Sequence, residues 1–293
     1  MIHSTAILIA CCVLIWAVMY FTWRYRLKTR KGFILGLTLP EIAHDDRETL
    51  AITGSFKKRL NMAMIPLLLM IAPIFLMLPA GRAMILFMIW LLLAIAAPMA
   101  VYVMHHNWLL ALKQAKNWYS AEPDGDKYWI WGIFYRNPDD GKLFVKNRSG
   151  IGNTMNLAKP AGRAMAVFSL ICVLSLPFLG FWMWNEERTP IKLVLNESAL
   201  SARHTGDLYV IPLKTIESVE LLDKLPRMIR VGGMSLGNFL KGRFRLDGYG
   251  VCRLLLRSGE PPYLVIKSGA NTYILSDADS RITSEVYEYL RRR

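Results

Sequence analysis

The sequence predicts an α-helical membrane protein with four transmembrane helices and a C-terminal all-β domain, a small barrel closed by one helix. Two observations predict this fold class. The chain has 293 residues, 54% of them hydrophobic, and many of these lie in long runs without any Asp, Glu, Lys or Arg. That apolar content is high for a soluble domain. The C-terminal part instead alternates short strand-like runs with turns, which is typical of a small β-domain.

Each apolar run has at least the ~17 residues that a helix needs to cross a bilayer. The second and third runs are separated only by Pro79-Ala80-Gly81-Arg82, so they are expected to form a membrane hairpin. In the fourth run, Pro177 and Gly180 are expected kink points, and Trp182 and Trp184 suit a membrane interface. The predicted spans are residues 6–23, 62–78, 83–104 and 164–184.

The first run allows two interpretations. Its basic residues follow the apolar stretch, whereas the charge of a secretory signal peptide precedes it. Leu8-Ile9-Ala10-Cys11 also fits the lipobox of a bacterial lipoprotein, with Cys11 as the lipidated residue. The apolar stretch continues past Cys11, which favours a transmembrane helix, and lipidation is left open. The remaining cysteines are interpreted as small buried hydrophobes: Cys12, Cys172 and Cys252.

The net charge of +14 is concentrated in segments that flank the apolar runs, which favours membrane lipids over nucleic acid as a partner. The loop 24–60 has nine Lys/Arg against four acids, and segment 105–163 has nine against five. Positive charge is retained in the cytoplasm, so both segments are predicted to lie inside a bacterial plasma membrane. The N-terminus and residues 185–293 are then extracytoplasmic. The opposite orientation, with a cytoplasmic domain that binds inner-leaflet lipids, is the alternative.

Segment 105–163 begins as a continuation of the third helix and then contains a predicted β-hairpin module. Tyr128–Tyr135 is an aromatic, strand-prone run, and Lys142–Lys146 is a second strand-like run. Between them, Asn137-Pro138-Asp139-Asp140-Gly141 has the composition of a turn. We therefore expect these two runs to pair with each other.

Residues 127–163 resemble the bacterial domain-of-unknown-function family 5808. The resemblance implies the membrane region of SdpI-like immunity proteins, and Lys31–Pro40 is similar to a linker of that family. The membrane region is degenerate, since the family's Pro-x-His motif is missing after the second span. The candidate motif residues of the hairpin module are Tyr135, Asn137, Pro138, Asp140, Gly150, Gly152 and Asn156.

The C-terminal domain, residues 185–293, contains many strand-like runs and ends in a predicted helix, Arg281–Leu290. Ile282, Val286 and Leu290 share one face of that helix. Residues 242–279 carry a resemblance to bacterial pleckstrin-homology-type domains. The resemblance implies a small barrel that hosts lipid, peptide or protein binding, and it does not assign a ligand.

One hairpin of this domain is expected to present a basic face. Apolar and basic residues alternate on either side of the turn Gly248-Tyr249-Gly250. A three-residue turn would set Arg245 opposite Arg253 and Leu246 opposite Cys252, which separates the two faces. The face is either a solvated surface that discourages edge aggregation or a site for an anionic partner. The predicted face consists of Lys241, Arg243, Arg245, Arg253 and Arg257.

No catalytic, metal or cofactor site is predicted. Transporters and intramembrane enzymes generally need ionisable groups at depth, and the four predicted spans have none. Adjacent His105 and His106 point about 100° apart on a helix, and the turn explains Asp139 and Asp140. We therefore predict a non-enzymatic sensor, scaffold or immunity-type signalling protein that binds membrane lipids and either a protein or an anionic ligand. A transporter or membrane-enzyme component is the alternative, and homo-oligomerisation is left open.

Overall fold

The computed structural model describes residues 2–27, 32–119, 125–148 and 152–293, with the side chains from residue 6 onward. The chain divides into two compact units. The first comprises Met1–Leu78 and Ile85–Gly180, and the second comprises Pro79–Met84 and Phe181–Arg293. Each unit is described by itself.

Four helices in the described residues are long and apolar enough to span a membrane, as the sequence predicts. All four extend beyond the predicted apolar runs. Helix α2 begins inside the predicted loop 24–60, because the Asp46 carboxylate caps it by accepting hydrogen bonds from the N–H groups of Glu48 and Thr49 at 2.9 and 3.3 Å. The helices are α1 (Ile2–Tyr25), α2 (Arg47–Leu76), α3 (Ala80–Ala115) and α4 (Pro160–Arg188).

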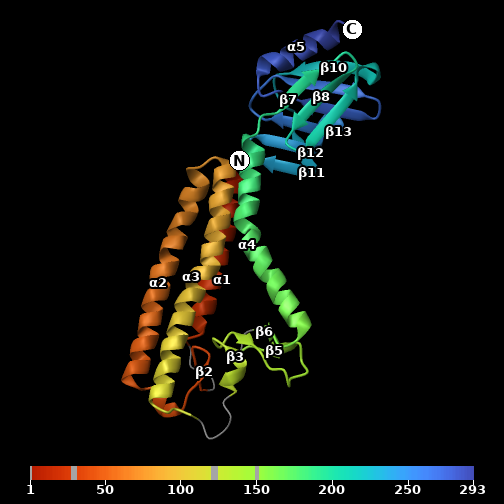
Figure 1. The fold of residues 1–293 in the computed structure, drawn as a ribbon. Helices are drawn as coiled ribbons and strands as arrows, with labels where there is room; N and C mark the ends of the chain where they lie inside the picture. The colour runs from red at the N-terminus through yellow and green to blue at the C-terminus, as the bar shows by residue number, and fades with distance from the viewer. Residues whose placement is uncertain (1, 28–31, 120–124, 149–151) are drawn as a thin grey trace. The chain divides into compact units, whose positions relative to one another are not determined.

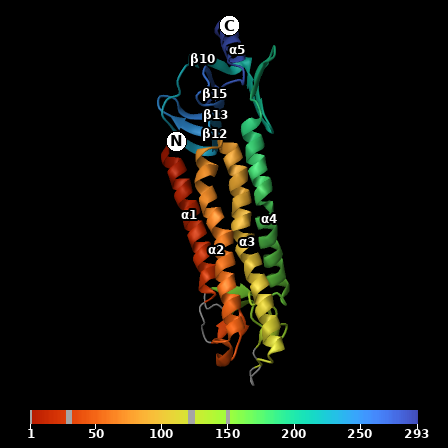
Figure 2. The same cartoon turned by 90° about the vertical axis from the view of Figure 1, so that its left-hand side faces the viewer.

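Within the first unit, α1, α2 and α3 lie side by side (Figures 1 and 2). Polar side chains join them. Trp16 of α1 donates to the carbonyl oxygen of Met64 at 2.7 Å, and Trp90 of α3 donates to that of Leu67 at 2.7 Å. Buried donors that find carbonyl partners avoid the cost of an unpaired polar group in an apolar environment.

Three polar segments of the first unit meet at Asp126. Thr38, from the hairpin of β1 (Phe33–Ile34) and β2 (Leu37–Thr38), donates its hydroxyl to Asp126 Oδ1 at 3.0 Å. Lys113 of α3 donates to Asp126 Oδ2 at 2.7 Å, and Arg148 forms an ion pair with the same carboxylate. Both bases are nearly buried, so the cluster fixes the loops against the helix end. Two short 3₁₀ helices complete these segments: η1 (Glu41–Ala43) and η2 (Asp126–Tyr128).

The predicted pairing within the hairpin module is wrong. The aromatic run folds back on itself, so that β3 (Trp129–Ile130) pairs with β4 (Phe134–Tyr135). Trp131 and Gly132 both have positive φ, and the Ile133 N–H donates to the Ile130 carbonyl at 3.1 Å, as in a type I′ turn. The second predicted strand, β5 (Phe144–Lys146), pairs instead with β6 (Asn153–Met155).

The second unit contains a three-stranded and a six-stranded sheet followed by helix α5 (Ser280–Arg291). The three-stranded sheet has the order β7 (Lys192–Leu195), β8 (Ala199–His204), β9 (Asp207–Pro212), and η3 (Leu213–Thr215) follows it. The six-stranded sheet has the order β10 (Ile216–Leu222), β14 (Tyr263–Ser268), β15 (Asn271–Leu275), β13 (Gly250–Arg257), β12 (Phe239–Leu246), β11 (Met228–Leu236). Strands β10 and β11 are its two edges, so the sheet does not close into the predicted barrel.

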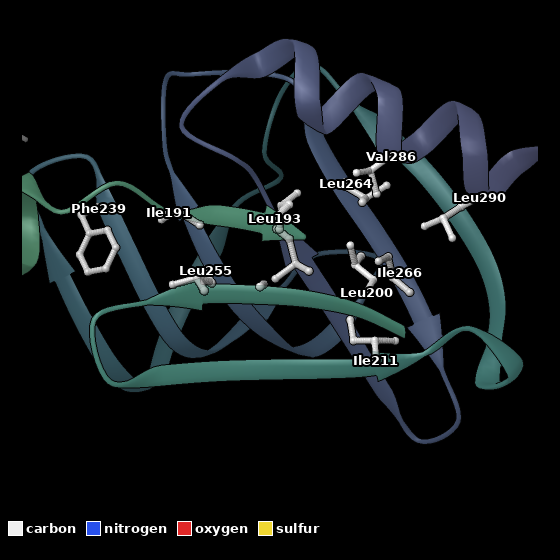
Figure 3. Packing of buried hydrophobic residues seen from close by; sticks show 12 residues of the cluster. Ile191, Leu193, Leu200, Ile211, Phe239, Leu255, Leu264, Ile266, Val286 and Leu290 are labelled. Carbon is white, nitrogen blue, oxygen red and sulfur yellow. The ribbon is translucent and has the colours of Figure 1, made fainter. Parts of the chain in front are cut away.

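Both faces of the six-stranded sheet bury apolar side chains. One face packs with the three-stranded sheet and α5, where Val286 and Leu290 point toward Leu264 and Ile266 of β14 (Figure 3). The opposite face forms a second cluster that includes Phe244 and Cys252. Successive side chains of one strand point to opposite faces of the sheet, so consecutive residues enter different cores.

Candidate binding face of the C-terminal domain

The predicted basic hairpin is present, but its register differs from the expected one by two residues. Leu246 pairs with Gly250, and Arg245 pairs with Val251. The loop between the strands is Asp247-Gly248-Tyr249. A shift of two residues leaves every side chain on its predicted face, since facing repeats every two residues. Burial of the apolar face therefore determines which side chains share a face of the sheet, but it does not determine which residues pair.

Three of the five predicted basic residues are exposed on one face of this sheet. Arg243 lies opposite Arg253, and Arg245 lies two residues further along β12. No ion pair found in the described part of the chain involves any of the three. The guanidinium of Arg253 lies over the Tyr273 ring, 5.9 Å from its centroid. We define Arg243, Arg245 and Arg253 as the arginine face.

The other two predicted bases hold the end of α4 instead. Arg257 donates to the carbonyl oxygens of Glu187 and Thr189, the latter at 3.2 Å, where a helix end leaves carbonyls unpaired. Lys241 donates to Glu186 Oε2 at 2.9 Å and also forms an ion pair with Asp207. Burial alone would lower the pKa of Lys241, but the hydrogen bonds to these two carboxylates outweigh it and raise that pKa above its ordinary value.

A partly buried cluster around Lys241 was not predicted from the sequence. Glu186, His204 and Asp207 place one ligand atom each within 4.8 Å of one another, which is close enough for a metal ion. The ammonium of Lys241 pairs with both carboxylates of this cluster, so the protein supplies its own cation there. Glu186 and Lys241 are far from His204 and Asp207 in the sequence, and no recognised motif connects the four residues.

His204 is neutral in this cluster at ordinary pH. Its Nε2–H donates to the Glu186 carbonyl at 3.0 Å, and its ring lies 4.5 Å from the Phe239 ring centroid. Burial lowers the pKa of His204 below its ordinary value of 6.5, and the nearby Glu186 carboxylate only partly opposes this.

Glu187 connects the same helix end to the turn before α3. Its carboxylate accepts a hydrogen bond from the Gly81 N–H at 2.6 Å, in the first turn of α3. An acidic group stabilises a helix N-terminus. The two adjacent acids at the end of α4 therefore have structural partners, Glu187 at this turn and Glu186 in the C-terminal domain.

The candidate motif residues of the hairpin module meet around the buried side chain of Asn156. Asn156 Oδ1 accepts from the backbone N–H of Asn137 at 3.0 Å, and its Nδ2 donates to the Asn137 carbonyl at 2.7 Å. The Tyr135 hydroxyl donates to Asp140 Oδ2 at 3.1 Å. A hydrogen bond from the Lys142 N–H lowers the pKa of Asp140. These contacts are those of a fixed turn.

The remaining motif residues contribute less to holding this turn. The Pro138 carbonyl accepts a 3.4 Å hydrogen bond from Lys159 Nζ. Gly152 has a φ of 70°, which a residue with a side chain rarely adopts. Gly150 lies outside the described residues. The two adjacent histidines considered in the sequence are buried and act structurally: His106 Nδ1 donates to the Leu35 carbonyl at 2.7 Å, and His105 Nδ1 to that of Val101 at 2.7 Å.

Comparison with protein families matches residues 191–290 to the family described as Bacterial PH domain. The match confirms the pleckstrin-homology-type domain expected from the sequence, and the four apolar helices support the membrane region. The resemblance to family 5808 is not shown by this comparison and stays a prediction. No curated protein and no solved structure matches the chain.

Proposed function

We propose that this chain is a non-enzymatic membrane protein whose pleckstrin-homology-type domain binds an anionic partner through the arginine face. The role that we propose is that of a sensor, a scaffold or an immunity-type factor. The observation that carries the proposal is the exposed trio Arg243, Arg245 and Arg253, which has no carboxylate partner among the described residues.

The charge arrangement supports an external partner. Like charges that lie opposite each other on a sheet, as Arg243 and Arg253 do, are mildly destabilising. Of the two other bases of the predicted face, Lys241 pairs with two carboxylates and Arg257 donates to two backbone carbonyls, whereas these three have no such partners among the described residues. Guanidinium groups pair readily with carboxylates and phosphates. The competing interpretation is a solvated face that only discourages aggregation.

We further propose that the N-terminus and the pleckstrin-homology-type domain are extracytoplasmic and that the hairpin module is cytoplasmic. The support is the charge bias of segments 24–60 and 105–163. In that orientation the arginine face meets partners at the cell surface, and the inner module contacts the membrane or a cytoplasmic protein.

Binding of a fluorescent polyglutamate peptide to the full chain in phosphatidylcholine nanodiscs tests the proposed function. The triple change R243E/R245E/R253E should weaken binding by at least about tenfold, since each base near an anionic surface contributes about 1 kcal/mol. The matched control is K192E/R203E/K214E, which makes the same change in net charge at exposed residues of the three-stranded sheet and η3. Equal weakening by both variants, or no binding by the unmodified chain, would refute a specific arginine face.

A further inference from the structure

Exposed aliphatic side chains are interleaved with the arginine face. Ile229 of β11 pairs with Arg245, which pairs on its other side with Val251 of β13. Ile229 is 72% exposed and Val251 is 47% exposed. Val231, at the bulge of β11, is 49% exposed. A soluble partner that recognised only charge would gain nothing from this exposed apolar surface.

The arginine face also lies close to the end of a membrane span. Lys241 of β12 contacts Glu186, which follows the last apolar residues of α4. Arg243 and Arg245 are two and four residues further along the same strand, about 7 and 14 Å at the usual rise per residue. Within the second unit, only Thr189 and Pro190 separate α4 from the first core residue of the domain, Ile191.

We infer that the arginine face is a docking surface for the anionic phospholipids of the chain's own membrane. This inference rests on the proposed function and names the partner that it leaves open. Arg243, Arg245 and Arg253 pair with lipid phosphates, while Ile229, Val231 and Val251 enter the boundary between headgroups and acyl chains. Because α4 holds the domain at the bilayer, the face needs only a weak affinity for lipid to stay docked.

The observations favour a bilayer over an acidic protein. A bilayer surface offers phosphates and apolar groups together across a wide area, so it satisfies both kinds of side chain without a shaped groove. Ile229 and Val251 pair directly with Arg245, and Arg243 pairs with Arg253, so these residues of three neighbouring strands share one face of the sheet. Val231 lies beside them at the bulge of β11. This combination of exposed bases and exposed aliphatic groups is typical of surfaces that adsorb to anionic membranes.

The test uses the full chain, with its four cysteines replaced, in nanodiscs that contain brominated phospholipids. A bimane dye on V251C reports contact with the acyl region by quenching, and a dye on K192C serves as the matched control on the three-stranded sheet. One set of discs contains phosphatidylcholine alone, and the other contains equal parts of phosphatidylcholine and phosphatidylglycerol.

We expect at least twofold stronger quenching at residue 251 in the mixed discs than in phosphatidylcholine discs, with no such difference at residue 192. High salt and R243Q/R245Q/R253Q should abolish the difference, and K192Q/R203Q/K214Q, with the dye on V251C, should leave it intact. Unchanged exchange of the backbone amides of residues 191–290 checks that each variant is folded. Quenching that does not depend on phosphatidylglycerol, or that survives R243Q/R245Q/R253Q, overturns the inference.

The two proposals fail in different ways. If the discs give no quenching but polyglutamate still binds through the arginine face, the partner is an acidic protein and the lipid inference is wrong. If neither lipid nor polyglutamate engages the face, the proposed function itself is wrong.

Discussion

At the scale of single residues, the hairpin module depends on Asn156. Its side chain is buried and makes hydrogen bonds with both backbone groups of Asn137 and with the N–H of Ala158. A backbone carbonyl also occupies the space beside Gly162, where a Cβ would lie 2.2 Å from the Asn156 oxygen. The amide side chain of Asn156 therefore fixes the turn against the segment that follows β6, and its backbone carbonyl packs against the first turn of α4.

Asn156→Ala should destabilise this module, because partly buried backbone groups of residues 137 and 158 lose their partner. A fully buried group left unpaired costs about 1–3 kcal/mol, so each of these groups should cost less than that. Hydrogen exchange of peptides that cover residues 134–148 should accelerate accordingly, while the control N153A, at an exposed side chain of β6, should change little. Equal exchange in both variants would show that Asn156 has no special role.

His204 should make the C-terminal domain sensitive to acid. Burial lowers its pKa below the ordinary value of 6.5, so the unfolded chain binds a proton at a pH where the folded chain does not. The resulting contribution to stability is complete above about pH 6.5 and is lost as the pH falls toward the lower folded pKa. The Glu186 carboxylate lies 3.5 Å from Nδ1 of the ring and forms an ion pair with Lys241.

Hydrogen exchange of residues 191–290, corrected for the intrinsic pH dependence, should therefore show protection that falls as the pH drops below about 6.5. His204→Gln should flatten this dependence, although it also lowers stability at neutral pH. If H204Q leaves the pH dependence of protection unchanged, groups other than His204 cause the acid sensitivity.

At the scale of helices and strands, the sequence predicted which segments are helical or extended better than it predicted which strands pair with each other. The apolar runs marked the four long helices, and α3 continues past its run into segment 105–163, as the sequence predicts. The polar start of α2 lacks such a run, since its apolar residues are spaced along one helix face. The aromatic run 128–135 was predicted as one strand because its composition is strand-prone throughout. Gly132 divides it, since that residue adopts a φ of 63° and approaches the backbone of Gly36.

The register of β12 and β13 can be tested by cross-linking. In the cysteine-free chain, R245C/V251C should form a disulfide under mild oxidation, because these residues lie directly opposite each other. R245C/R253C should not form one, since residue 253 lies opposite Arg243 instead. A disulfide only in the second variant would restore the register that the hydrophobic alternation first suggested.

At the scale of the whole molecule, the candidate site was partly predictable. Alternation placed five bases on one face, and three of them are exposed there. The sequence did not reveal that Lys241 and Arg257 hold the end of α4, because Glu186 lies 55 residues from Lys241 and Glu187 lies 70 residues from Arg257. Contacts between distant segments depend on topology, and neither charge nor periodicity along the chain encodes topology.

Membrane orientation decides which leaflet the arginine face meets, and the proposed orientation rests on the distribution of charge. Segments 24–60 and 105–163 have excess positive charge, and they lie on the same side of a four-span chain. We therefore expect D139C, in the hairpin module, to be protected from an impermeant thiol reagent in whole cells, and K192C, in the C-terminal domain, to react. Both native side chains are exposed, so accessibility within the fold does not bias the comparison.

Labelling after permeabilisation supplies the control, because both cysteines must then react. The reverse pattern in intact cells, with D139C reactive and K192C protected, would contradict the charge argument. It would also place the arginine face at the inner leaflet, whose anionic lipids attract bases most strongly. Lipid docking would survive that reversal, since it depends on α4 holding the domain at a bilayer and not on which side of the membrane that bilayer surface faces.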